Sequence, residues 1–63
     1  MHSIATGRDV AAERVRAGLT QAQLARLVGV SARRIANVEA GYRVSDAFAE
    51  RVFNALARAT TDR

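Results

Sequence analysis

The amino-acid sequence predicts an all-α fold, and three observations lead to this class. The 63 residues include no proline, and residues of high helix propensity, above all alanine, leucine and arginine, are abundant. No stretch alternates β-branched and polar residues as a strand does. Capping residues and glycines divide the chain into four helix-sized segments. We therefore expect one compact four-helix domain over residues 1–63, ordered over about residues 6–59, with a five-helix domain as the alternative.

Serine and threonine mark the starts of the helices. Thr20 is followed three residues later by Gln23, which is the spacing of a capping box, in which each side chain accepts a hydrogen bond from the other residue's backbone N–H. Thr6, Ser31 and Ser45 stand in the equivalent position before the other three segments. These residues therefore predict where all four helices begin.

Glycines mark the ends of the first three helices. Gly18, Gly29 and Gly41 each follow a helical run, and glycine adopts the left-handed conformation of a helix C-terminus at the lowest cost. The starts and stops together predict helices at residues 7–17, 21–28, 32–40 and 46–59.

The connection between the second and third helices is very short. Gly29, Val30 and Ser31 leave too few residues for antiparallel packing, so the two helices must meet at a steep angle. Ala25, one turn before the bend, has the small side chain that a close crossing requires. This geometry predicts a helix-turn-helix over residues 21–40.

The third helix has two different sides. At about 100° per residue, Ile35 and Val38 share one side, whereas Arg33 and Asn37 lie among alanines on the opposite side. Arginine can bridge the two acceptors of guanine, and asparagine can pair with adenine, so this side could contact bases in DNA. An arginine-bearing helix is also commonly just a solvated surface, and these residues alone leave both interpretations open.

Composition and charge narrow the class of protein. The net charge is +4 and all ten basic residues are arginine, which favours a polyanionic partner. There is no cysteine, and the single histidine, His2, is interpreted as an exposed bystander. We therefore expect no enzyme, metal, cofactor or small-molecule ligand. No apolar run reaches membrane-spanning length and no signal peptide is evident, so we expect a soluble, cytoplasmic protein that stays in the cell that made it.

The first helix carries an arginine within its apolar face. Val10, Ala11 and Val15 are expected to share one side, and Arg14 projects within the same arc. A charge that points toward the core is costly unless it is paired. Glu39, on the flank of the third helix, is the predicted partner; the alternative is that Arg14 extends its side chain to water.

The fourth helix is predicted to supply much of the core. Its apolar stripe consists of Phe48, Val52 and Leu56, supported by Ala49 and Ala55. Phe53 lies at the edge of this stripe, where it could pack against the core or belong to a subunit interface.

The segment GLTQAQLARLVGVSARRIANVEAG, residues 18–41, resembles the signature of the phage repressor and Cro family, the lambda-repressor-like helix-turn-helix domains. Gln21 opens the second helix, Ala25 and Gly29 hold the small-residue and corner positions, and Glu39 and Gly41 match the Glu-x-Gly ending. The resemblance extends over the first and fourth helices. It implies a partner of double-stranded operator DNA, with the third helix in the major groove and a two-fold homodimer as the common arrangement.

The resemblance also implies roles for single residues. Three positions of the third helix match those that contact bases: Ala32, Arg33 and Asn37. Five positions match those that contact the DNA backbone: Gln21, Ser31, Arg34, Tyr42 and Arg43. Arg14 and Glu39 match the family's interhelical ion pair, in agreement with the argument from the apolar face of the first helix.

The sequence departs from the family pattern in two places. Leu27 is apolar where members often carry a polar residue, and the chain ends soon after the fourth helix, where many relatives have a fifth helix used for dimerisation. The resemblance implies a sequence-specific transcriptional regulator of the Cro or repressor type, acting in a bacterial or phage-infected bacterial cell. The alternatives are a protein-interaction module such as an antitoxin or regulator inhibitor, which Leu27 and Phe53 favour, and an excisionase or architectural DNA-binding protein.

Overall fold

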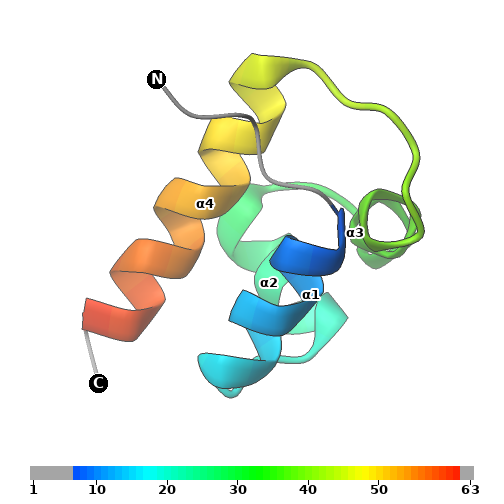
Figure 1. Cartoon of the computed structure of the whole chain (residues 1–63). Coiled ribbons are helices and arrows are strands. Elements are labelled where there is room, and N and C mark those ends of the chain that lie inside the picture. The colour runs from blue at the N-terminus through cyan, green and yellow to red at the C-terminus, as the bar shows by residue number, and fades with distance from the viewer. Residues whose placement is uncertain (1–6, 62–63) are drawn as a thin grey trace.

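The computed structural model describes residues 7–61, which form four helices and no strand (Figure 1). The helices are α1 (Gly7–Arg16), α2 (Gln21–Val28), α3 (Ala32–Glu39) and α4 (Asp46–Thr61). The all-α four-helix prediction is confirmed. The last helix, α4, continues two residues beyond its predicted end, to the last described residue, so residues 7–61 contain no fifth helix. His2 and the predicted first cap, Thr6, lie outside the described residues.

The predicted caps hold the helix starts. The Thr20 hydroxyl oxygen accepts a hydrogen bond from the Gln23 N–H at 3.0 Å, and Gln23 Oε1 accepts one from the Thr20 N–H at 2.8 Å. This is the predicted capping box. Ser31 Oγ accepts from the Arg34 N–H, and Ser45 Oγ accepts from the Phe48 N–H, each at 3.1 Å. Each cap satisfies a backbone donor that the first turn of a helix leaves free.

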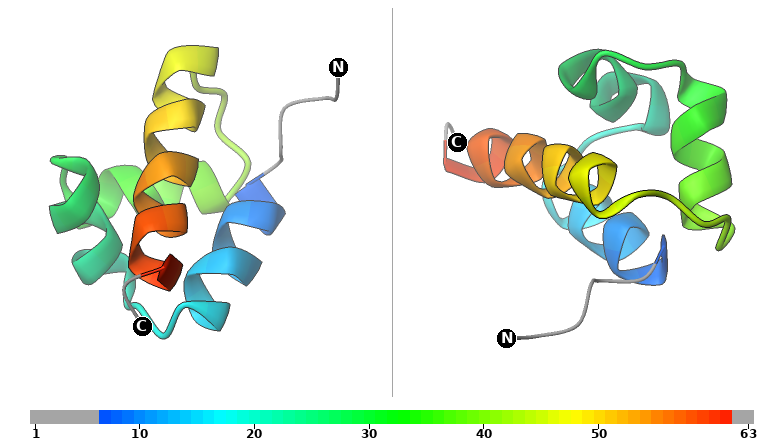
Figure 2. Two further views of the ribbon diagram at one scale, coloured as in Figure 1. Left: turned by 90° about the vertical axis from the view of Figure 1, so that its left-hand side faces the viewer. Right: turned by 90° about the horizontal axis from the view of Figure 1, so that it is seen from above.

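The bend between α2 and α3 depends on Gly29. Its φ of 93° and ψ of 32° lie in the left-handed region, which residues with a Cβ rarely adopt. The N–H groups of Gly29 and Val30 both donate to the Ala25 carbonyl, at 2.7 and 2.9 Å, and close the end of α2. Ser31 then caps α3, so the two helices run in clearly different directions (Figure 2). This is the predicted helix-turn-helix.

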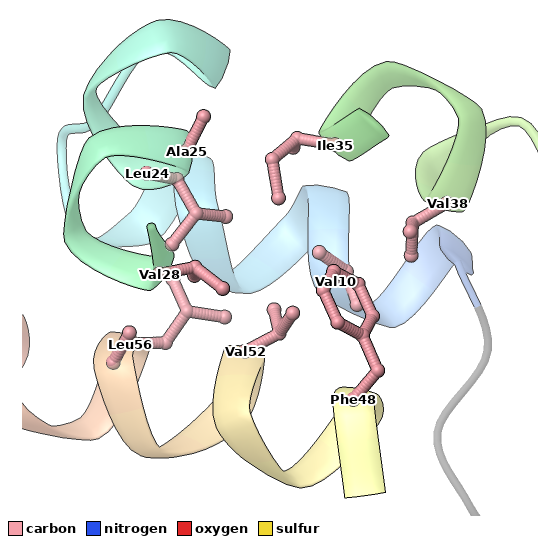
Figure 3. Packing of buried hydrophobic residues seen from close by; sticks show 10 residues of the cluster. Val10, Leu24, Ala25, Val28, Ile35, Val38, Phe48, Val52 and Leu56 are labelled. Carbon is pink, nitrogen blue, oxygen red and sulfur yellow. The ribbon is translucent and has the colours of Figure 1, made fainter. Parts of the chain in front are cut away.

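The core lies where all four helices meet (Figure 3). Leu24 of α2, Ile35 of α3 and Val52 of α4 are completely buried, and Val10 of α1 packs against the same cluster. Burial of each such side chain contributes about 1.5–3 kcal/mol to folding. The predicted stripe of α4 is confirmed, since Phe48, Ala49, Val52, Ala55 and Leu56 are all buried.

One prediction for α1 is wrong. Val15 does not share the buried side of Val10, because 65% of its surface is exposed. At 3.6 residues per turn Val15 lies about 140° around the helix from Val10, whereas Arg14 and Ala17 lie within about 40°. Ala17 is therefore the buried residue near the end of α1, at 4% exposure. Ala11, the third residue of the predicted face, is half-buried.

The start of α1 lies directly against the end of α3. A Cβ atom added to Gly7 would overlap the carbonyl oxygen of Val38 and lie 3.1 Å from the carbonyl carbon of Glu39. Only glycine permits this approach between the two backbones. Gly7 therefore sets how closely α1 supports the C-terminal end of α3. No helix among residues 7–61 is long and apolar enough to cross a membrane.

Candidate nucleic-acid interface

The two sides of α3 have opposite environments. Ile35 and Val38 are buried against the core, whereas Ala32 and Arg33 at the N-terminal end are exposed. Asn37, one turn beyond Arg33, is half-buried. The predicted division of the helix into a core side and an outer side is confirmed. The outer side carries hydrogen-bonding side chains and little bulk around them.

The loop after α3 brings more polar residues to the same surface. The Tyr42 N–H donates to the Asn37 carbonyl at 3.0 Å, which folds the loop back along α3. A cleft of about 100 Å³ results, lined by Arg34, Asn37, Val38, Tyr42, Arg43 and Val44. Four predicted contact residues, Arg34, Asn37, Tyr42 and Arg43, thus lie around one depression. Tyr42 and Arg43 are both exposed.

Arg14 and Glu39 form an ion pair that joins α1 to the end of α3. Arg14 Nε donates to Glu39 Oε2 at 2.7 Å, and Arg14 Nη2 donates to Glu39 Oε1 at 3.1 Å. A third guanidinium N–H, on Nη1, reaches the Leu19 carbonyl at 2.9 Å. The side chains of Arg14 and Glu39 are only 16% and 8% exposed. A two-pronged pair this well shielded holds its geometry much better than a surface pair.

The same contacts set the protonation of both groups. For Arg14, the hydrogen bond to Glu39 raises the pKa, with the negative charge of Glu39 adding to it against the opposing effect of burial. For Glu39, burial alone would raise the pKa, but hydrogen bonds from Arg14 and Gln21, together with the charge of Arg14, lower it below the ordinary glutamate value. Both residues are therefore charged at neutral pH.

Gln21 takes part in this network in a way that the sequence did not indicate. Its Nε2 donates to Glu39 Oε1 at 2.9 Å, and the side chain is half-buried. Gln21 is the first residue of α2, so Glu39 connects α1, α2 and α3 through two partners. The amide nitrogen of Gln21 has two hydrogens, so the predicted phosphate contact would use the hydrogen that Glu39 does not accept.

A second group that the sequence did not indicate joins α3 to α4. The guanidinium of Arg34 stacks on the ring of Phe48, 4.5 Å from its centre, and that of Arg51 lies 5.8 Å from the same centre. Arg51 Nη2 also donates to the Val28 carbonyl at 2.7 Å, at the end of α2. The spacing of Phe48 and Arg51, three residues apart on one helix, is the signal that could have suggested their contact.

Two apolar side chains were predicted to be candidates for a contact surface. Leu27 on α2 is 48% exposed. Phe53 is half-buried, and it lines a shallow cleft of about 400 Å³ together with Val10, Val44 and Val52. Both side chains are thus partly accessible to a partner.

A three-residue bend between two short helices, with arginines and an asparagine on the outer side of the second helix, defines the class of DNA-binding helix-turn-helix domains. The helix-turn-helix family model matches residues 10–62, and the chain belongs to this family, in its Cro/C1 type. Double-stranded DNA is the partner that this family binds. No curated protein and no solved structure matches the chain.

Proposed function

We propose that this protein is a sequence-specific regulator of transcription, of the repressor or Cro type, which occupies an operator with α3 in the major groove. The observation that carries the proposal is the outer side of α3. Arg33 is exposed there with no ion-pair partner among residues 7–61, and Asn37 lies at the rim of the adjacent cleft. Because Ile35 and Val38 anchor the opposite side, the helix can enter a groove without unpacking.

Base contacts come from the first two turns of α3. Arg33 donates to the two acceptors of a guanine, Asn37 pairs with an adenine, and Ala32 contacts a thymine methyl group. Each well-placed contact of the first two kinds discriminates against a wrong base by about 1–3 kcal/mol.

Backbone contacts surround these residues and set the position of α3. Ser31 still has a hydroxyl hydrogen to donate after its oxygen has accepted the cap bond. The other contacts come from the start of α2, from α3 and from the loop after it, through Gln21, Arg34, Tyr42 and Arg43. Such contacts contribute to affinity for all DNA sequences alike.

The small size of the domain supports binding as a two-fold homodimer. A single α-helical module of this kind covers about 600–1,000 Å² of protein surface on DNA, which is at the low end for specific complexes. Two copies that read half-sites about 34–36 Å apart double the number of base contacts.

A second candidate function is a protein-interaction module on the same fold. The exposed side chain of Leu27 and the cleft beside Phe53 favour it, because partly buried apolar surface is typical of binding to another chain. In this case the affinity for duplex DNA would be weak and would not differ between DNA sequences.

Selection of bound duplexes from a random pool, followed by binding assays on the selected and a scrambled duplex, tests the proposal. Arg33→Ala and Asn37→Ala should each lose about 1–3 kcal/mol on the selected duplex and much less on the scrambled one. Arg43→Ala should weaken both duplexes equally and reduce the dependence of affinity on salt. Equal losses on both duplexes for the Arg33 and Asn37 variants would refute base reading by α3. A weak affinity that is the same for the selected and the scrambled duplex would favour the protein-interaction module.

A further inference from the structure

Arg51 lies on α4, outside the helix-turn-helix, yet its guanidinium and that of Arg34 both lie over the ring of Phe48, 5.8 and 4.5 Å from its centre. We propose that Arg34 and Arg51 together hold one phosphate of the DNA backbone, with the ring of Phe48 as the base of this arginine clamp. The proposal rests on the proposed DNA-binding function and adds a contact site from a fourth element of the fold.

The ring of Phe48 preorganises both arginines. Phe48 is buried in the core, and its face attracts a guanidinium stacked on it. Arg34 and Arg51 are both exposed residues, so the N–H groups at the edges of their guanidinium planes can reach a ligand. Arg51 is held further by its hydrogen bond to the Val28 carbonyl. Less side-chain freedom is therefore lost when the clamp binds a ligand.

The clamp has two positive charges and, within residues 7–61, no negative side chain paired with them. Neither Arg34 nor Arg51 has a carboxylate partner among residues 7–61, where the ion pairs join Arg14 to Glu39 and Arg16 to Glu13. Two positive groups at one ring repel each other, and an anion between them relieves that repulsion. A guanidinium has five N–H donors, and Arg51 uses one of them for Val28, so donors remain for a phosphate.

The position of the clamp favours a phosphate of bound DNA as the anion. Arg34 lines the cleft that also contains Asn37, Tyr42 and Arg43, so the clamp continues the surface proposed to contact DNA. A duplex on α3 presents its backbone to both flanks of the helix. The loop with Tyr42 and Arg43 would meet the backbone at one place, and Arg34 with Arg51 would meet it at another.

The test compares three variants that each replace one arginine by glutamine. Arg34→Gln and Arg51→Gln alter the clamp, and Arg58→Gln is the matched control. Arg58 is exposed on the last turn of α4, about 10 Å farther along the helix than Arg51. Affinity for a random-sequence duplex of about 20 base pairs is measured between about 50 and 200 mM salt. All variants are measured at a temperature at which circular dichroism shows them to be folded.

The slope of log affinity against log salt reports how many phosphates are neutralised, at about 0.9 per phosphate. Arg34→Gln and Arg51→Gln should each make the slope shallower by part of this value, and the double variant should make it shallower by about 0.9 in total. Arg58→Gln should leave it unchanged, and Arg51→Lys, which keeps the charge, should restore most of it.

Three results would overturn the clamp. If the salt slope of Arg51→Gln equals that of Arg58→Gln, Arg51 does not contact DNA, and the proposed function stays intact. This result is expected if the anion that binds Arg51 is a carboxylate of a protein partner and not a DNA phosphate. A double variant that loses about 1.8 shows two separate phosphates. A wild-type slope near zero refutes the proposed function itself.

A measurement on the wild-type chain avoids any effect of the substitutions on folding. Nuclear magnetic resonance resolves the Nε–H groups of arginines, and these respond when a phosphate binds. On titration with the same duplex, the Nε–H signals of Arg34 and Arg51 should both shift, whereas that of Arg58 should not. A shift of Arg34 without a shift of Arg51 contradicts the proposal.

Discussion

The substitution Glu39→Ala removes the acceptor of three hydrogen bonds at once. Two of them come from Arg14, at 2.7 and 3.1 Å, and one comes from Gln21, at 2.9 Å. The Arg14 side chain is only 16% exposed, so it keeps a largely buried charge whose remaining partner is the Leu19 carbonyl. The variant therefore loses the link from α1 and α2 to the end of α3.

The expected cost is large in relation to the stability of the whole domain. Removing one partner of a fully buried ion pair destabilises a protein by about 3–5 kcal/mol, and for this pair, with side chains 16% and 8% exposed, we expect the lower value. At about 0.05–0.15 kcal/mol per residue, a chain of 63 residues has a free energy of unfolding of roughly 3–9 kcal/mol. Each kcal/mol corresponds to about 4–8 °C in Tm for a domain of this size. We therefore expect Glu39→Ala to lower the Tm by at least about 12 °C, or to unfold the domain.

Thermal unfolding followed by circular dichroism measures this effect. The matched control is Glu13→Ala, which breaks the exposed pair with Arg16, whose N···O distance is 3.4 Å. That pair should contribute about 0.5 kcal/mol or less. The double variant Arg14→Met with Glu39→Leu removes the unpaired charge, so its Tm should lie above that of Glu39→Ala.

A Tm of Glu39→Ala equal to that of Glu13→Ala would refute the reasoning. It would mean that Arg14 reaches water as easily as a surface arginine does, so that the pair contributes nothing to holding α1 against α3. A double variant less stable than Glu39→Ala would show that packing, and not the unpaired charge, causes the loss.

Three further predictions concern pH, backbone contact and capping. The folded-state pKa of Glu39 is lowered, so the stabilising effect of its charge is complete above the ordinary glutamate pKa of about 4.3 and is lost as the pH falls through the lower folded value. The difference in Tm between wild type and Glu39→Gln should therefore shrink in acid. A difference that grows in acid would contradict this assignment. Gly7→Ala should destabilise the fold by about 1–3 kcal/mol in thermal unfolding, because the added Cβ overlaps the Val38 carbonyl. Helix propensity alone would raise the Tm, so a higher Tm would show that α1 does not lie against the end of α3. Thr20→Ala should cost about 1 kcal/mol in urea unfolding through loss of the capping box, and an unchanged midpoint would exclude that contribution.

The helices and the sides of α3 were predictable because their causes lie within a few residues along the chain. A cap bond joins Thr20 to Gln23, three residues away, and Gly29 closes α2 through a bond to Ala25, four residues away. The inner side of α3 follows from the spacing of Ile35 and Val38 in the same way. The error at Val15 came from accepting too wide an arc on a helix of 3.6 residues per turn.

The contacts around the candidate interface depend on helices that are distant in sequence. Arg14 and Glu39 are 25 residues apart, and this pair could still be inferred because a charge that points toward the core needs a partner. No such requirement applied to Gln21, whose bond to Glu39 spans 18 residues, or to Arg51, which reaches Val28 across 23. A glutamine or an arginine on a helix surface can be equally stable with many different partners or with water. The partner that Gln21 or Arg51 contacts therefore depends on how the four helices pack together, and only the folded chain decides that.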